Sequence, residues 1–444
     1  MNDDFYFKWN YDNYDNYNRT KRTNNNRNTR KKKKTKSRSS NARMQSNYRK
    51  RQAKKLNYKK VFIFLVIVFL VFYSIISGIV RIISRNKNST EIPAFVQPQK
   101  EVSANVVVIG DIMCHTTNFY DAYDAFNDTY DFSTVFTDVK DYIQGVDIAI
   151  GNLETTFAGK DVGYTGYPTF NTPEQLAQNI KDLGIDVVST ANNHSLDKRY
   201  EGLVNTLDEL DKVGLSHTGT YRSKEDQDVI LTKDVNGIKF AFLSFTYGTN
   251  GIPVPSGKEY CINLIDENLI LEQISKAKAL NPDVLCVSMH WGDEYKLKQN
   301  STQEKLADFL FKNGVDIIFG SHPHVLEPME KRTITLDDGS TKDGFVIYSL
   351  GNFMSGQVIE NTMNSIILKM KITKHSDNTV TIDAYDYIPI YMYDKGSGQP
   401  DRYKILDINR CISAYENGDS SISEALYNKL IEARKMIDKV FKSE

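Results

Sequence analysis

Short apolar runs alternate with amphipathic stretches along most of the chain beyond about residue 104. Apolar runs of this length, bounded by turn residues, predict buried strands at 105–110, 146–151, 185–190, 283–289 and 315–320. Apolar positions at helical spacing predict helices at 172–184, about 200–213, 301–314 and 421–441. This alternation is typical of an α/β domain in which helices flank a largely parallel sheet.

Capping and turn residues mark the ends of several of these elements. Thr172 is the expected N-cap of the first helix, and Ser301 and Glu304 have the spacing of a capping box at the start of the third. The dipeptide N-G at 236–237 joins two apolar runs and predicts a hairpin. Glycines are expected to end three helices, at Gly184, Gly214 and Gly314, and alternating patterns predict two further strands, at 363–374 and 378–391.

One apolar run differs from all the others in length. Residues 61–80 contain no charged side chain. A helix of 20 residues spans about 30 Å, the thickness of the hydrocarbon core of a bilayer. The run is longer than the apolar part of a cleavable signal peptide, and no A-x-A site follows it. We therefore expect an uncleaved transmembrane signal anchor, with a buried core helix as the alternative.

The formal net charge of zero conceals two regions of opposite sign on either side of this run. Residues 1–60 hold 20 Lys or Arg against 4 Asp, a net charge of +16, whereas residues 91–444 have a net charge of −19. Positive flanks stay in the cytoplasm, so we expect a single-pass protein of the cell membrane with its C-terminal domain extracellular. The basic tail is expected to be disordered and to contact anionic membrane lipid, in preference to nucleic acid.

These observations divide the chain into five expected regions. They are a cytoplasmic tail (1–60), a transmembrane anchor (61–80), a linker (81–103), the α/β domain (104–395) and a C-terminal helical segment (396–444). The four cysteines are scattered without a C-x-x-C pair and suggest no disulfide framework. Cys286 lies inside an apolar run and is expected to be a core residue.

Polar residues with metal-binding side chains follow all five predicted strands. The carboxyl ends of parallel strands lie along one edge of a sheet, where ligands bind. Five of the seven histidines of the chain stand at such ends, which is hard to explain by caps and turns alone. The residues concerned are Asp111 and His115, Asn152 and Glu154, Asn193, His194 and Asp197, His290, and His322 and His324.

A site of two divalent metal ions uses this set of side chains. Mn²⁺, Zn²⁺ and Fe²⁺ accept imidazole, carboxylate and amide ligands together, and two ions about 3.5–4 Å apart are bridged by a carboxylate. His322 and His324 are separated by one proline. If the backbone is extended there, both side chains point to the same side and face the crevice.

Six motifs in this order resemble the CapA family of poly-γ-glutamate capsule-synthesis proteins, which is similar to the calcineurin-like metallophosphoesterases. The motifs are G-D-I-M, N-L-E, A-N-N-H-S-L-D, H-W-G-D-E-Y, G-S-H-P-H-V and Y-S-L-G-N-F, and together they span about 104–360. The resemblance implies a four-layer α/β/β/α sandwich preceded by a single transmembrane helix. It also implies membrane subunits of a polymer-synthesis complex as partners, and an anionic polymer or a phosphate ester as substrate.

The resemblance also implies roles for individual residues. The metal ligands would be Asp111, Glu154 as the bridging carboxylate with Asn152 as its rival, Asn193, His290, His322 and His324. His194 with Asp197 would be the catalytic acid dyad. The family pattern D-x-H has Met113 in the place of its histidine, and His115 is the expected substitute.

Two classes of function remain open at this point. The first is synthesis or export of a poly-γ-glutamate capsule, with or without hydrolysis. The second is a surface metallophosphoesterase that acts on a cell-wall or other phosphate ester, unrelated to a capsule.

Overall fold

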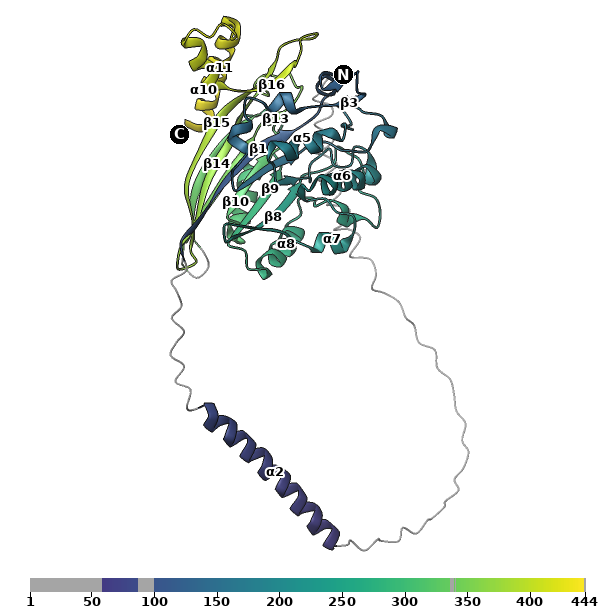
Figure 1. Cartoon of the computed structure of the whole chain (residues 1–444), viewed down its shortest axis with the longest axis vertical. Coiled ribbons are helices and arrows are strands. Elements are labelled where there is room, and N and C mark those ends of the chain that lie inside the picture. Colours follow the sequence, from purple (N-terminus) through teal and green to yellow (C-terminus); the bar gives the residue numbers. More distant parts are fainter. Residues whose placement is uncertain (1–57, 87–99, 336–338, 340, 443–444) are drawn as a thin grey trace, which may run out of the picture. The chain divides into compact units, whose positions relative to one another are not determined.

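The computed structural model describes residues 58–86, 100–335, 339 and 341–442 (Figure 1). The chain divides into two compact units, 1–98 and 99–444. In the first unit, helix α2 (Tyr58–Asn86) contains the predicted apolar run. Its window Phe62–Ile79 has a mean hydropathy of 2.8, and it is long and apolar enough to cross a membrane. Most of the predicted tail (1–57) and linker (87–99) lies outside the described residues.

The second unit contains two large β-sheets (Figure 1). The first sheet has the order β16-β15-β14-β1-β4-β5-β6, with β13 beside β1. Its strands are β1 (Val102–Ile112), β4 (Ile148–Leu153), β5 (Val187–Ser189), β6 (Ser216–Thr218), β13 (Asn352–Met354), β14 (Asn364–Lys374), β15 (Val380–Asp394) and β16 (Tyr403–Asp407). The second sheet has the order β11-β12-β10-β9-β8-β7. Its strands are β7 (Leu231–Val235), β8 (Ile238–Thr246), β9 (Val284–His290), β10 (Ile317–Ser321), β11 (Leu326–Thr335) and β12 (Thr341–Leu350).

The second sheet has a parallel centre and an antiparallel strand at each edge, whereas in the first sheet only the side formed by β14, β15 and β16 is antiparallel. The strands β1, β4, β5 and β6 run parallel in the first sheet, and β8, β9, β10 and β12 run parallel in the second. The predicted hairpin joins β7 to β8, and both of its turn residues, Asn236 and Gly237, have positive φ. Positive φ at both central residues is what a two-residue hairpin turn of type I′ requires.

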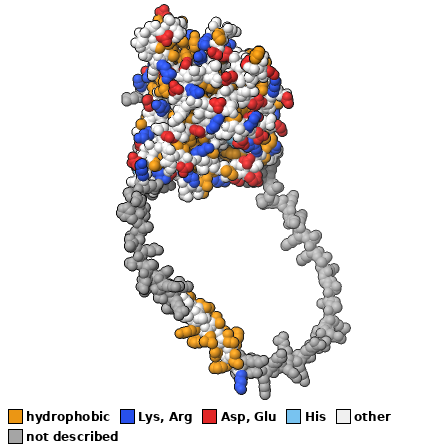
Figure 2. Space-filling model, in the orientation of Figure 1, with side chains coloured by type: hydrophobic (Ala, Val, Ile, Leu, Met, Phe, Trp, Pro, Cys, Tyr) orange, Lys and Arg blue, Asp and Glu red, His pale blue; other side chains and the backbone are white. Residues whose placement is uncertain are grey.

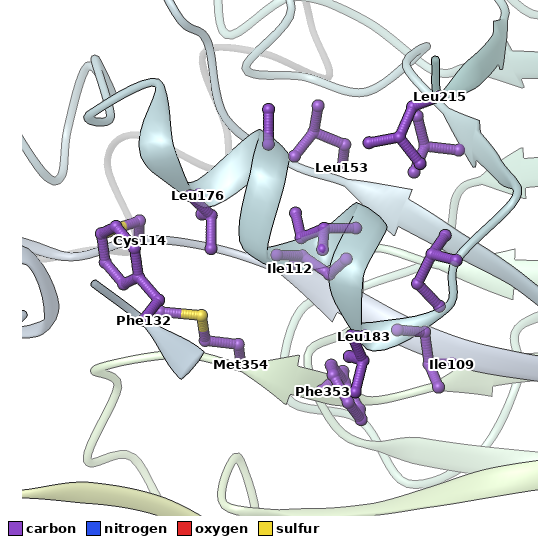
Figure 3. Packing of buried hydrophobic residues seen from close by; sticks show 14 of the residues in the cluster. Ile109, Ile112, Cys114, Phe132, Leu153, Leu176, Leu183, Leu215, Phe353 and Met354 are labelled. Carbon is purple, nitrogen blue, oxygen red and sulfur yellow. The ribbon is translucent and has the colours of Figure 1, made fainter. Parts of the chain in front are cut away.

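Three hydrophobic layers hold the two sheets and their helices together. Along β1 the side chains alternate: Val106 and Val108 belong to the core between the sheets, whereas Val107 and Ile109 face outward. The outward face is covered by helices α5 (Gln175–Leu183) and α6 (Arg199–Val213), and Figure 3 shows part of that packing. Helices α8 (Glu267–Ala279) and α9 (Ser301–Lys312) cover the outer face of the second sheet. The predicted α/β/β/α order is confirmed.

The C-terminal segment is an integral part of this unit. Strand β16 extends the first sheet, and helix α10 (Ile408–Glu416) follows it. Helix α11 (Glu424–Lys442) inserts Leu430 and Ile437 into the core between the sheets, against β11 and β15. The helix at 421–441 was predicted correctly, but β16 and α10 were not predicted.

Two predicted helix starts are wrong. Helix α5 begins at Gln175, and Thr172 instead hydrogen-bonds through its hydroxyl to the hydroxyl of Thr155 at 2.6 Å. Helix α9 is capped by Asn300, which forms a capping box with Gln303, one residue before the predicted pair. An extended backbone at Asn300 lets its side chain accept hydrogen bonds from two N–H groups of the first turn.

The unit also contains several short elements, and acidic and basic side chains are mixed on its surface. The short elements are α3 (Thr116–Asp121), β2 (Tyr123–Asp124), β3 (Thr129–Tyr130), α4 (Lys140–Ile143) and α7 (Lys224–Asp228). Figure 2 shows acidic and basic side chains interspersed over the visible face of this unit, whereas α2 presents hydrophobic side chains. All four cysteines are free, and Cys286 is buried in the core as expected.

Candidate metal centre

The carboxyl ends of the central strands bring the predicted site residues together. In the first sheet Asp111 at the end of β1 pairs with Asn152 of β4, and in the second sheet His290 at the end of β9 pairs with Ser321 of β10. Contacts between side chains at the strand ends of the first sheet and side chains at the strand ends of the second join the two sheets at this edge. Nine predicted residues are buried there: Asp111, Asn152, Glu154, Asn193, His194, Asp197, His290, His322 and His324.

Glu154, directly after β4, lies at the centre of the cluster. Its side chain is fully buried, and neither carboxylate oxygen has a hydrogen-bond partner. Its Oε1 lies 3.5 Å from Nε2 of His290 and 3.9 Å from Nε2 of His324. Burial and the nearby carboxylates of Asp111 and Glu294 raise the pKa of Glu154 well above its usual value. A buried carboxylate in this state is stabilised by a cation among its neighbours.

Three overlapping groups of side chains place their ligand atoms within 4.8 Å of one another. They are Glu154, His290 and His322; Asp111, Glu154 and His324; and Glu294, His322 and His324. Because Glu154 belongs to two of the groups, it lies where a carboxylate could bridge two ions. The donor set of imidazole and carboxylate suits a borderline divalent metal. The residues therefore fit the metal that the sequence motifs imply.

Asn152 and Asn193 have different surroundings. The Nδ2 group of Asn152 donates to Oδ1 of Asp111 at 2.8 Å, and its Oδ1 accepts from the Ser189 hydroxyl at 2.8 Å. The amide of Asn152 is thus already engaged, which favours Glu154 for the bridging position. Oδ1 of Asn193 instead lies 2.8 Å from Nε2 of His290, so that both atoms can face one ion.

His322 and His324 converge in a way that the sequence did not predict. Both have positive φ, 99° and 59°, so the backbone is not extended as expected. The chain turns sharply after β10 ends at Ser321, and this turn still brings the two rings within 5.9 Å of each other. Nδ1 of His322 is buried without a hydrogen-bond partner. Burial and the charge of neighbouring histidines lower the pKa of His322 well below its usual value, which keeps the ring neutral, as a metal ligand must be.

His194 and Asp197 form the predicted dyad beside the cluster. Nδ1–H of His194 donates to Oδ2 of Asp197 at 2.7 Å, and the backbone N–H of Phe170 donates to the same oxygen at 2.7 Å. The ring of Phe170 packs edge-on against His194 with 4.7 Å between centroids. These contacts fix the tautomer and orientation of the imidazole and leave Nε2 available for a proton.

His115 lies near the cluster but is held elsewhere. Its Nδ1 accepts a hydrogen bond from the backbone N–H of Gly356 at 3.1 Å, and its ring packs against Phe170. Burial, with His324 and His194 nearby, lowers the pKa of His115 to about 4. Among the residues that the structure describes, His115 belongs to none of the three ligand groups.

Three residues of the site were not predicted. Glu294 stands inside the quoted motif H-W-G-D-E-Y, so the motif could have pointed to it. Tyr247 lies over His322 with 4.5 Å between ring centroids, and Asn250 places Nδ2 3.5 Å from the ring nitrogens of His194. The last two lie in T-Y-G-T-N-G, where the sequence gives only a turn signal.

A four-layer α/β/β/α sandwich with carboxylate, amide and imidazole groups at its strand ends defines a metallophosphoesterase-like domain. Within this class, residues 105–357 match the family described as bacterial capsule synthesis protein PGA_cap, and the chain belongs to that family. The resemblance found in the sequence is thereby confirmed.

Relatives of known name agree with this membership. The chain is 29% identical over 330 residues to "Capsule biosynthesis protein CapA" of Bacillus anthracis, covering 72% of this chain and 75% of the relative. It is 27% identical over 353 residues to "PGA biosynthesis protein CapA" of Bacillus subtilis, covering 76% of this chain and 83% of the relative. The chain is therefore a relative of capsule-biosynthesis proteins over most of its length.

Solved structures with a similar arrangement are more distant. The calcineurin-like phosphoesterase YfkN from Bacillus subtilis is 14% identical with a TM-score of 0.42, over 76% of this chain and 100% of that one. The NAD nucleotidase NadN of Haemophilus influenzae has the same identity and TM-score, over 77% of this chain. The match spans less than two thirds of NadN, 61%.

Proposed function

We propose that this chain is a single-pass membrane protein whose extracellular domain acts in the synthesis or export of an anionic capsule polymer of the poly-γ-glutamate type. The family and the names of two relatives support the capsule role. The apolar helix α2 and the basic residues before it support the anchor and its orientation. Membrane subunits of a polymer-synthesis complex would be its partners.

We further propose that the domain works with two divalent metal ions, Mn²⁺, Zn²⁺ or Fe²⁺. The observation that carries this proposal is the buried carboxylate of Glu154, which lies between two histidines with both oxygens free of hydrogen bonds. Asp111 and His324 would hold one ion with it. Asn193, His290 and His322 would hold the other.

When bound, such ions would supply Lewis-acid chemistry, by polarising a water molecule and an oxygen of the substrate. Side chains of the protein would orient the metal ligands and supply a proton. Ser321 hydrogen-bonds Nδ1 of His290 at 2.9 Å and thereby orients that ring. His194, held by Asp197, would keep a proton on Nε2 and give it to the leaving group.

The metal ions would also supply the positive charge that a polyanion requires. The region 91–444 has a net charge of −19, and the acidic and basic side chains on its visible face are mixed. A surface of this kind does not attract an anionic polymer from a distance. Bound divalent ions would make the crevice the place where an anionic group of the polymer is held.

Complementation tests the capsule role. The full chain and its Glu154→Gln variant would be expressed in a Bacillus subtilis strain that lacks its own PGA biosynthesis protein CapA, and polymer at the cell surface would be measured. We expect the wild type to restore polymer and the variant to fail at equal membrane abundance. Normal polymer with the variant would contradict a role for the metal centre in this process.

The alternative is a surface phosphoesterase unrelated to a capsule. The short hydrogen bond between His194 and Asp197 favours it, because a positioned acid is needed for hydrolysis but not for polymer binding. Phosphomonoester and phosphodiester hydrolysis by the metal-loaded chain, without any complementation, would support this alternative. Complementation with no hydrolysis would exclude it.

A further inference from the structure

One ligand group of the proposed metal centre has fewer side chains than the family pattern predicts. Asp111, Glu154 and His324 form a group of three, whereas the D-x-H pattern of this class would add a histidine at the position of Met113. Met113 is a buried thioether next to β1 and offers no imidazole. Divalent ions of this kind take four or more ligands, so a further side chain of the chain or water must complete the set.

Glu294 lies beside one member of this group, His324. Its carboxylate, His322 and His324 place their ligand atoms within 4.8 Å of one another. His324 thus belongs both to the group of Glu294 and to the group of Asp111. A second observation points to a ligand between Glu294, His322 and His324. His322 is 3% exposed, and its Nδ1 has no hydrogen-bond partner.

The loop that carries Glu294 is fixed on both sides. Before it, Oδ2 of Asp293 accepts a hydrogen bond from Nδ2 of Asn300 at 2.9 Å. After it, the backbone N–H of Tyr295 donates to the carbonyl of Pro323 at 2.8 Å, which ties the loop to the turn between the two histidines. A carboxylate on an anchored loop loses less conformational entropy on binding an ion than one on a free loop.

His115, the substitute that the sequence suggests, fits less well. Its Nδ1 already accepts the N–H of Gly356, and a Cβ on Gly356 would lie 2.8 Å from the Cβ of His115, so the ring is packed tightly against this segment. Reaching an ion at Asp111 through Nδ1 would break that hydrogen bond.

We propose that Glu294, beside His322 and His324, is a further ligand of the metal centre, and that it adds a carboxylate to a centre that lacks the histidine expected at Met113. This inference rests on the proposed metal centre. A further carboxylate makes the centre as a whole richer in oxygen ligands, and oxygen ligands favour Mn²⁺ over Zn²⁺.

Metal binding by the full chain in detergent tests this assignment without any need for activity. Mn²⁺ titrations by calorimetry, with elemental analysis of the loaded protein, would compare wild type, Glu294→Gln and the neighbouring control Asp293→Asn. The control removes the same charge one residue away and keeps a side-chain oxygen that can accept the hydrogen bond from Asn300. We expect two Mn²⁺ in the wild type and a loss of affinity for one of them of about tenfold or more in Glu294→Gln, because even outer partners of a metal cost about 10–100-fold. The control should stay within about twofold.

Two further variants decide between the candidate ligands. Glu294→His should recover binding and shift preference toward Zn²⁺, whereas His115→Gln should leave both affinities unchanged. A wild type that binds two ions together with an unaltered Glu294→Gln variant would overturn the role of Glu294 and leave the proposed metal centre standing. A wild type that binds no Mn²⁺, Zn²⁺ or Fe²⁺ would overturn both.

Discussion

Oε1 of Glu154 lies 3.5 Å from Nε2 of His290, and neither oxygen of this buried carboxylate accepts a hydrogen bond. Without a cation this arrangement costs free energy, because the buried carboxyl, whose pKa is raised, must either take up a proton or remain an uncompensated charge. Metal binding would therefore stabilise the fold. We expect added Mn²⁺ at about 100 times its dissociation constant to raise the free energy of unfolding by about 2.7 kcal/mol.

The Glu154→Gln variant should separate the cost of burying the carboxyl from the stabilisation that bound metal provides. Replacing the ionisable carboxyl by a neutral amide should stabilise the metal-free protein by about 1–3 kcal/mol while abolishing most of the stabilisation by metal. Thermal unfolding with and without Mn²⁺ measures both quantities. A variant that is less stable than wild type in the absence of metal, or that gains as much from Mn²⁺, would contradict this view of Glu154.

The dyad next to the metal centre should affect turnover without affecting metal content. If the chain hydrolyses a phosphate ester, His194→Ala should lower kcat by about 10²–10⁴-fold, the usual contribution of a general acid. His217 on β6, which lies 3.1 Å from Asp211 and belongs to none of the three ligand groups, provides the control His217→Ala. Steady-state kinetics and elemental analysis on the same samples check this, and a loss of metal in His194→Ala would instead make His194 a ligand.

Glu327 should make stability depend on pH. This carboxyl is buried on β11 and accepts a 2.6 Å hydrogen bond from Gln303, yet burial raises its pKa from 4.5 to about 8. The folded state therefore keeps a proton that the unfolded state has lost, so the contribution of Glu327 to stability falls as pH rises from 4.5 to 8. The loss is on the order of a few kcal/mol.

The Glu327→Gln variant keeps the hydrogen-bond acceptor and removes the titration. Urea unfolding at pH 5, 6.5 and 8 should show that the free energy of unfolding of the variant rises relative to that of wild type as pH rises. A constant difference between the two proteins across this range would mean that Glu327 titrates normally.

Gly110 should be intolerant of a side chain. A Cβ at this position would lie 1.9 Å from the carbonyl oxygen of Gly351, which accepts the backbone N–H of Asp111 at 2.9 Å. Gly110→Ala should therefore destabilise the fold by about 3 kcal/mol or more and displace Asp111. At Gly248 nothing lies within 4 Å of an added Cβ, so Gly248→Ala is the matched control. Chemical unfolding of both variants checks this, and equal stabilities would show that β1 can shift at no cost.

The apolar helix should hold the chain in the membrane. If Phe62–Ile79 spans the bilayer, the full chain should stay in the membrane fraction after high-salt and alkaline washes, whereas a chain that begins at Gln99 should be released. Protease added to intact cells should digest the unit from 99 onward. Protection of that unit until the cells are lysed would contradict an extracellular location.

Much of the fold could be predicted because its strands are short apolar runs and its helices have clear periodicity. The first residues of the helices were harder to predict. The sequence N-S-T-Q-E offers two overlapping capping boxes, and only the backbone at Asn300 decides between them. Strand β16 and helix α10 were not predicted because no local sequence pattern marks them. Tertiary contacts stabilise both elements, β16 against β15 and α10 against α11.

The site could be predicted in its ligand types but not in its geometry. Motifs at strand ends pointed to Asp111 and the histidines, since parallel strands bring their carboxyl ends together. The reason given for His322 and His324 was wrong, because a left-handed turn and not an extended strand brings their rings together. Glu294 and Asn250 lie in loops, and their approach to the site depends on how those loops are anchored.

The most direct test of the metal centre is the number of ions bound per chain. Elemental mass spectrometry would be applied to the full chain in detergent after loading with Mn²⁺, Zn²⁺ or Fe²⁺ and removal of free ions, beside Glu154→Gln. We predict about two ions per wild-type chain and at most one in the variant, in which the proposed bridge has lost its charge. Wild-type protein that is folded and holds no ion under any of these conditions would contradict the proposed metal centre.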